Sequence, residues 1–161
     1  MNESTPLPES FTLDHEAVAA PYVRKAGDVR LRAGGQVVKW DVRFKQPNVS
    51  HLKMSVIHSI EHMLATTLRT VTSDVIDISP MGCQTGFYVA VDGAELAEFD
   101  AFTDVLTQGI DRALNLTAVP GASVVECGWA ASHDLEGAQD AMREFLDERG
   151  TWANVFGTRR A

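Results

Sequence analysis

Residues 29–44, VRLRAGGQVVKWDVRF, decide the fold of this chain. Apolar and polar residues alternate on both sides of Gly34-Gly35, a pair that tolerates the positive φ of a tight turn. The alternation predicts a β-hairpin with one buried face, made of Val29, Leu31, Ala33, Val38, Trp40, Val42 and Phe44. Arg43 then points to the opposite face, where we expect it to be free to meet a ligand or a partner.

The rest of the chain continues this alternation between strands and helices. Apolar residues at helical spacing predict helices at about 52–71, 96–114 and 134–150, the last with Asp134 as its N-cap and Gly150 as its stop. Short apolar runs predict strands at 75–79, 85–91 and 123–129, with an Asp92-Gly93 turn after the second. This mixture indicates an α+β two-layer domain, an antiparallel sheet packed against helices.

Length and charge restrict the function classes. The 161 residues suit a single catalytic domain, 1–161, with an N-terminal arm at 1–8 and a tail at 158–161. The net charge of -8 argues against nucleic acid as a partner, and no apolar run approaches the roughly 20 residues needed to cross a membrane. The acidic, polar start lacks the features of a secretion signal, so we expect a cytoplasmic protein. In that compartment Cys83 and Cys127 are expected to be free thiols, metal ligands or catalytic groups rather than a disulfide.

The stretch 54–65, MSVIHSIEHMLA, carries the first chemical signal. On a helix, His58 and His62 stack on one face, within reach of a single metal ion. His-x-x-Glu-His is the inverzincin arrangement, in which Glu61 acts as general base on a bound water. From this motif alone, the first hypothesis is a metallopeptidase.

Two cysteines offer different chemistry. The thiolate of Cys127 is the obvious third ligand, which leaves a fourth position open, although a buried small apolar residue is an equally good interpretation. Cys83 lies in a Pro/Gly turn, where a nearby cation such as Arg43 favours a thiolate that can move protons. An incidental turn residue is the alternative.

Six ordered segments together resemble the S-ribosylhomocysteine lyase family, which produces the autoinducer-2 precursor. They are ESFTLDH (9–15), APYVR (20–24), KWDVRF (39–44), IHSIEH (57–62), IDISPMGCQTGFY (76–88) and ECGWAASHDLEGA (126–138). The resemblance runs from about residue 7 to about residue 157. Ser59-Ile60 depart from the Thr-Leu that the family commonly has there.

The resemblance implies a carbon–sulfur lyase that converts S-ribosylhomocysteine to homocysteine and 4,5-dihydroxy-2,3-pentanedione. It implies carbonyl migration through enediols followed by β-elimination, and a fold related to the inverzincin peptidases. It also implies a homodimer with active sites at the interface, each helped to close by the partner's N-terminal arm.

The resemblance also implies roles for individual residues. One divalent metal, ferrous iron in the family and often zinc or cobalt in isolated protein, would be held by His58, His62 and Cys127. Cys83 and Glu61 would be the catalytic acid/base groups, and the substrate-binding residues would be Ser10, His15, Arg43 and Asp77. The alternatives are a small inverzincin-like metallohydrolase and a metal-binding dimer with a structural site.

Overall fold

A computed structural model of the chain describes residues 7–157. Most of the expected arm, 1–6, and the expected tail, 158–161, lie outside the described residues. The main elements in chain order are α1 (Glu9–Thr12), β1 (Tyr22–Arg30), β2 (Gln36–Arg43), α2 (Met54–Val71), β3 (Val75–Pro80), β4 (Gly86–Asp92), α3 (Gly93–Leu96), α4 (Phe99–Leu114), α5 (Leu135–Asp147) and the short 3₁₀ helix η1 (Arg149–Thr151). None of the helices among residues 7–157 combines the length and hydropathy that crossing a membrane requires.

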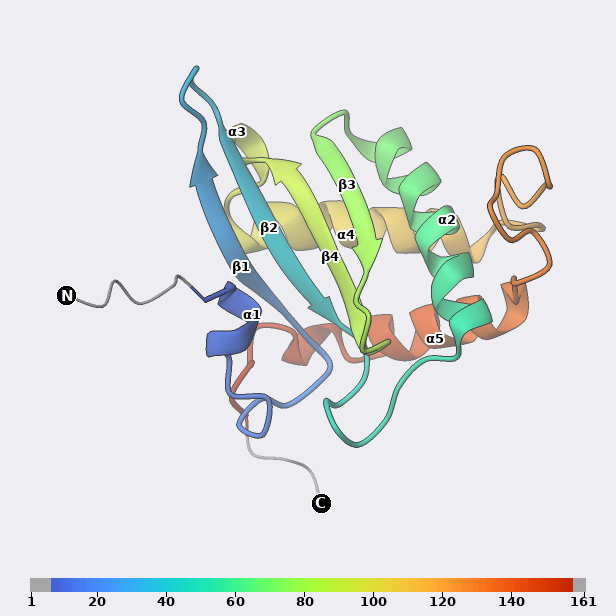
Figure 1. Ribbon diagram of the computed structural model, residues 1–161, viewed down its shortest axis with the longest axis horizontal. Coiled ribbons are helices and arrows are strands. Elements are labelled where there is room, and N and C mark those ends of the chain that lie inside the picture. Colours follow the sequence, from blue (N-terminus) through green and yellow to red (C-terminus); the bar gives the residue numbers. More distant parts are fainter. Residues whose placement is uncertain (1–6, 158–161) are drawn as a thin grey trace.

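The four strands form one antiparallel sheet in the order β1-β2-β4-β3. The long helices α2, α4 and α5 pack together on one face of this sheet, and α1 lies on the other face beside β1 (Figure 1). The predicted α+β two-layer architecture with an antiparallel sheet is therefore confirmed.

The hairpin prediction is confirmed at its turn and along β2. Gly34 and Gly35 both have positive φ, at 94° and 89°. Val38, Trp40 and Val42 are buried beneath the helices, and Trp40 stacks on Phe102 of α4 with ring centroids 4.7 Å apart.

The prediction is wrong for the first strand of the hairpin. β1 begins at Tyr22, and the side chains of Val29 and Leu31 are 58% and 50% exposed. After a register shift between Lys25 and Gly27, Val29 pairs with Val37 and therefore lies on the sheet face opposite Trp40, away from the helices. The tip of the hairpin then extends beyond the helical layer, so no helix covers it (Figure 1).

Arg43 is also not free, contrary to expectation. It lies on the sheet face opposite Trp40, as predicted, but only 1% of it is exposed. Asp41 beside it on β2 is completely buried and forms an ion pair with it. The reason is that segment 7–20 covers this face: Glu9 binds Arg24 at 2.6 Å.

The strand expected at 123–129 is not formed. These residues make turns, in which the backbone N–H groups of Glu126 and Cys127 both donate to the Ser123 carbonyl oxygen, at 3.1 and 2.9 Å. Val124 and Val125 are 87% and 91% exposed. The segment lies beyond the helices, far from a sheet edge, so its apolar residues have no strand to pair with (Figure 1).

The remaining boundaries need smaller corrections. The Asp92-Gly93 turn is the start of α3, where the Asp92 carboxylate caps the helix by accepting the Ala94 N–H at 2.9 Å. The helix expected from Leu96 therefore divides into α3 and α4. Asp134 caps α5 as predicted, accepting the Gly137 N–H at 2.9 Å.

The orientation of α2 positions the chemical groups. Its buried residues, including Ile57, Ile60 and Leu64, face the core. His58 and His62 are only partly buried, on the side of α2 that meets the segment between α4 and α5.

Candidate functional site

The imidazole rings of His58 and His62 project from successive turns of α2, with ring centroids 4.8 Å apart. Nδ1 of His58 lies 2.8 Å from the Ser132 carbonyl oxygen, and Nδ1 of His62 lies 2.8 Å from the Pro120 carbonyl oxygen. Because a carbonyl oxygen can only accept, each Nδ1 carries the hydrogen and donates it. Both Nε2 atoms keep a lone pair for a metal ion, held in place by backbone contacts.

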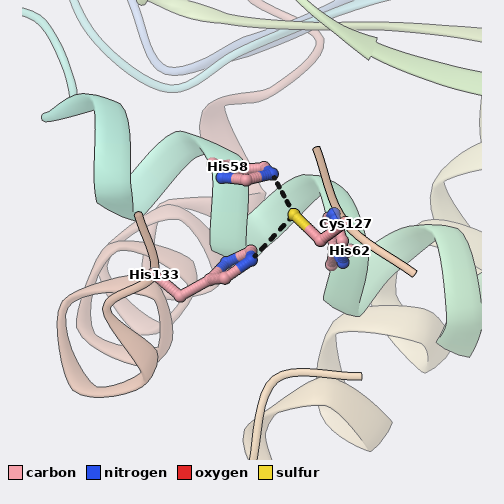
Figure 2. A group of neighbouring side chains, drawn as sticks. All are labelled: His58, His62, Cys127 and His133. Carbon is pink, nitrogen blue, oxygen red and sulfur yellow. Dashed lines mark hydrogen bonds between the residues drawn. The ribbon is translucent and has the colours of Figure 1, made fainter. Parts of the chain in front are cut away.

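Cys127 and His133 complete the cluster from the segment between α4 and α5 (Figure 2). The Cys127 sulfur lies 3.4 Å from Nε2 of His58 and 3.5 Å from Nε2 of His133. The ligand atoms of these three residues and His62 all lie within 4.8 Å of one another. Three imidazole nitrogens and one sulfur form a donor set suited to a divalent transition metal.

The protonation of His133 follows from the contacts of Ser59, which is fully buried on α2. The Ser59 hydroxyl donates its one hydrogen to the Ser55 carbonyl oxygen at 2.8 Å and accepts the Asp134 N–H at 2.8 Å. Its oxygen also lies 3.2 Å from Nδ1 of His133. Since Ser59 has no second hydrogen to give, Nδ1 of His133 donates, and its Nε2 keeps the lone pair that faces Cys127.

The electrostatic surroundings of His133 favour the same form. Burial lowers the pKa of His133 below its usual value, and the neighbouring His58 and His62 lower it further. A neutral imidazole is the form that binds metal, so the ring is prepared as a ligand.

His133 is the site residue that the sequence reasoning missed. The signal was present, because His133 follows Cys127 by six residues and directly precedes the helix cap Asp134. A lone histidine at that spacing is weak evidence for a metal ligand. Only the packing of α5 against α2 brings it to the cluster.

Next to the cluster, an open pocket of about 540 Å³ holds two of the predicted residues, Glu61 and Asp77, together with the expected ligand His62. Glu61 is half-buried, and the Asp77 carboxylate accepts a hydrogen bond from Ser79. Two carboxylate side chains, those of Glu61 and Asp77, thus lie beside the His/Cys cluster.

A separate open pocket of about 550 Å³ contains Cys83, His15, Arg43 and Thr85. Cys83 is exposed, as a turn residue is expected to be. Its sulfur lies 3.0 Å from the Thr85 hydroxyl oxygen, which in turn lies 2.9 Å from Nη1 of Arg43.

Arg43 is held rigidly behind this pocket. Its Nε and Nη2 donate to the two carboxylate oxygens of Asp41, at 3.1 and 2.8 Å. Burial lowers the pKa of Arg43, but the hydrogen bond and charge of Asp41 more than offset this, so the net shift is upward. The guanidinium stays charged although almost no part of it reaches solvent.

Comparison with known proteins gives one family. A family model described as S-ribosylhomocysteinase (LuxS) matches residues 8–156. The chain belongs to the S-ribosylhomocysteinase (LuxS) family.

Relatives in this family match over nearly their whole length. A protein named S-ribosylhomocysteine lyase from Listeria monocytogenes serotype 4a (strain HCC23) is 49% identical over 149 residues, which are 92% of this chain and 95% of the relative. Proteins of the same name from Staphylococcus aureus (strain bovine RF122 / ET3-1) and Staphylococcus haemolyticus (strain JCSC1435) are 46% and 45% identical. The matched regions cover 93% and 92% of this chain, and 95% and 94% of the two relatives. The resemblance drawn from the six segments is confirmed.

The roles of the single predicted residues stay predictions, but the structure shows how these residues are grouped. The structure brings the predicted ligands together with His133, and it places Glu61 and Asp77 beside them. It places His15 and Arg43 with Cys83. Within residues 7–157, no residue lines both pockets.

Ser10 lies in neither pocket lining. Its side chain instead bonds to Tyr88 on β4, the strand that follows Thr85. Burial raises the pKa of Tyr88, as does the charge of Asp41, while Arg43 and the Ser10 hydrogen bond lower it in part. Ser10 therefore lies on the same sheet face as Arg43, without reaching Cys83 in one chain.

Proposed function

We propose that this protein is a metal-dependent S-ribosylhomocysteine lyase, which releases homocysteine and 4,5-dihydroxy-2,3-pentanedione. The observation that carries the proposal is the convergence of His58, His62, Cys127 and His133 on one point, in a chain that is 45–49% identical to proteins of that name. A structural metal site would not need the adjacent pocket with Glu61 and Asp77.

The cluster fits one divalent metal ion. The hydrogen bonds at Nδ1 leave an Nε2 lone pair on each histidine, and Cys127 supplies a soft anionic donor. Ferrous iron is the expected ion, with zinc or cobalt as replacements in isolated protein. When bound, the ion supplies Lewis acidity that makes the protons next to the sugar carbonyl easier to remove.

Cys83 and Glu61 are the proposed proton carriers. The open-chain sugar has its carbonyl at C1, and a proton taken from C2 and returned to C1 moves that carbonyl to C2. A second transfer, from C3 to C2, moves it to C3. Removal of the C4 proton then forms the C4–C5 double bond as the C5–S bond breaks, and homocysteine leaves as a thiolate that takes up a proton. The enol left at C4 loses its hydroxyl proton and takes up a proton at C5, which gives 4,5-dihydroxy-2,3-pentanedione.

The substrate-binding residues belong to the same proposal. His15 and Arg43 line the Cys83 pocket and Asp77 lines the Glu61 pocket, so each proton carrier has polar groups beside it. Ser10, which bonds to Tyr88, is proposed to reach the substrate as part of the N-terminal segment.

A homodimer would unite the two pockets. Cys83 and Glu61 have to act on one sugar chain, yet their pockets share no lining residue within the described part of the chain. Apolar side chains are exposed beside both: Val49 lines the Cys83 pocket and is 72% exposed, and Trp129, close to Cys127, is 70% exposed. We propose that a second copy covers these residues and that its N-terminal segment helps to close the site.

A cytoplasmic location fits the same function. Cys83 and Cys127 are both free thiols, and a reducing compartment preserves that state. The relation to the inverzincin fold, which the family resemblance implies, stays a prediction.

The test is thiol release from S-ribosylhomocysteine by protein purified without oxygen. Wild-type protein is expected to release one thiol per substrate, while Cys83→Ala and Glu61→Ala lose activity by at least about 100-fold. Metal content is measured in every variant, so that loss of metal is distinguished from loss of a proton carrier. No thiol release by metal-loaded wild-type protein would contradict the proposal.

The alternative functions predict other outcomes in the same assay. A metallohydrolase would cleave peptides and tolerate Cys83→Ala, because Glu61 and a metal-bound water would suffice. A structural metal site would show no turnover with either substrate.

A further inference from the structure

Thr85 connects the buried Arg43 to the exposed Cys83. It is 4% exposed, and its hydroxyl oxygen lies 2.9 Å from Nη1 of Arg43 and 3.0 Å from the Cys83 sulfur. We propose that Thr85 is a positioning residue, which transmits the polarising effect of Arg43 to the Cys83 sulfur and thereby favours the thiolate.

The proton positions follow from the chemistry of the groups. A guanidinium can only donate, so the Thr85 oxygen accepts the Nη1–H of Arg43. The hydrogen of the Thr85 hydroxyl is then left for the sulfur of Cys83. Donation to a thiolate is a charge-assisted hydrogen bond, whereas a neutral thiol is a weak partner, so this contact stabilises the thiolate more than the thiol.

The contacts of Arg43 explain why Thr85 is needed between its guanidinium and the sulfur of Cys83. Two of its donor groups are occupied by Asp41, which also lies 3.2 Å from Nε of Arg24. The charge of Arg43 is therefore largely compensated inside the protein, and its remaining donor is directed at Thr85. The Thr85 hydroxyl thus adds a directed hydrogen bond to the charge interaction between Arg43 and Cys83.

Other titratable and charged groups surround this pocket. Those that line it or lie directly behind it are His15, His51, Arg43, Asp41, Arg24 and Tyr22. None of them is changed in the variants below. A difference between the variants therefore reports on the hydroxyl of Thr85.

The experiment measures alkylation of Cys83 by iodoacetamide in metal-loaded protein, as a function of pH. Trypsin places Cys83 in a peptide of residues 70–112 and Cys127 in one of residues 113–143, so mass spectrometry reads the two thiols separately. Thr85→Val removes the hydroxyl while keeping the size and β-branching of the side chain, and Thr85→Ser keeps the hydroxyl.

In Thr85→Val, we expect the alkylation rate of Cys83 at pH 7 to fall about tenfold, and the midpoint of its pH profile to rise by about one unit. Thr85→Ser is expected to stay close to wild type. Thr103→Val is the matched control, because Thr103 is also 4% exposed but bonds to the Phe99 carbonyl oxygen of α4, away from Cys83. That control is expected to leave the Cys83 profile unchanged.

An unchanged Cys83 profile in folded Thr85→Val would overturn the inference and leave Thr85 as a partner for Arg43 alone. Equal losses in Thr85→Ser and Thr85→Val would overturn it as well. Circular dichroism checks folding, and Thr85→Ala provides a second hydroxyl-free variant if the valine variant does not fold.

The inference rests on the proposed role of Cys83 in the lyase reaction, but alkylation needs no substrate. Suppose that no thiol is released from S-ribosylhomocysteine but Cys83 is alkylated more slowly in Thr85→Val. This result would refute the proposed function and still support the role of Thr85. Normal turnover with an unchanged alkylation profile would support the proposed function and refute the role of Thr85.

Discussion

The Ser59 hydroxyl group connects helix α2, the start of α5 and the imidazole of His133. It bonds to the backbone of α2 through Ser55, to the start of α5 through Asp134, and to the imidazole of His133. Threonine, which the family commonly has at this position, carries the same hydroxyl. The departure noted in the sequence therefore preserves the chemistry of the contact.

We predict that Ser59→Ala weakens metal binding about 10- to 100-fold, because His133 loses the partner that holds its Nε2 toward the cluster. Ser59→Thr is expected to bind as wild type does. Competition with a chelator, using Co(II) and its visible spectrum, measures the affinity.

Two further variants calibrate this measurement. Cys127→Ala is expected to lose the metal altogether, because it removes a donor, and Ser73→Ala removes an exposed serine hydroxyl outside the cluster. Wild-type affinity in Ser59→Ala would show that His133 does not need Ser59.

The strand β4 sets the position of Cys83, because its first residue, Gly86, follows Thr85 directly and pairs with Arg43 on β2. A side chain at Gly86 would overlap the carbonyl oxygen of Val42, which is backbone and has little room to move. The close approach of β2 and β4 at this point thus keeps Cys83 beside Arg43.

We predict that Gly86→Ala destabilises the protein by about 1–3 kcal/mol, since the strands must separate to admit one methyl group. Urea unfolding measures this loss. Gly150→Ala is the control, because an added Cβ there meets nothing within 4 Å. An equal effect of the two substitutions would show that the sheet adapts without cost.

At the level of the whole molecule, the two pockets pose the main question. The metal cluster lies where α2 meets the segment before α5, while Cys83 lies at the end of the sheet, among residues of the loop between β2 and α2. Within the described residues, the two proposed proton carriers, Cys83 and Glu61, line separate pockets. This separation is what the proposed dimer explains.

We predict that wild-type protein is a dimer at micromolar concentration and that Val49→Asp weakens dimerisation about tenfold or more, because a carboxylate would be buried in the interface. Analytical ultracentrifugation measures the association. Val29→Asp is the matched control, since Val29 is also more than half exposed but lies at the hairpin, away from the Cys83 pocket. A monomeric wild-type protein would contradict the proposal.

Local pattern predicted most of the elements correctly. The alternation around Trp40, the helical spacing through His58 and the cap at Asp134 each depend on a residue and its near neighbours in the chain. The same reasoning failed at Val124 and Val125, because an apolar run forms a strand only when another strand lies beside it.

The amino-acid sequence by itself determined the α+β class, the two helical histidines and, through six ordered segments, the family. Only the tertiary structure decided that His133 joins the cluster, that Arg43 is buried against Asp41, and that Thr85 lies between Arg43 and Cys83. The reason is physical. His133 lies 74 residues from Ser59, and Thr85 lies 42 residues from Arg43, so these contacts form only when the elements pack together. Arg43 and Asp41 are near neighbours on β2, but their burial depends on the segment that covers this face of the sheet, which no local spacing records.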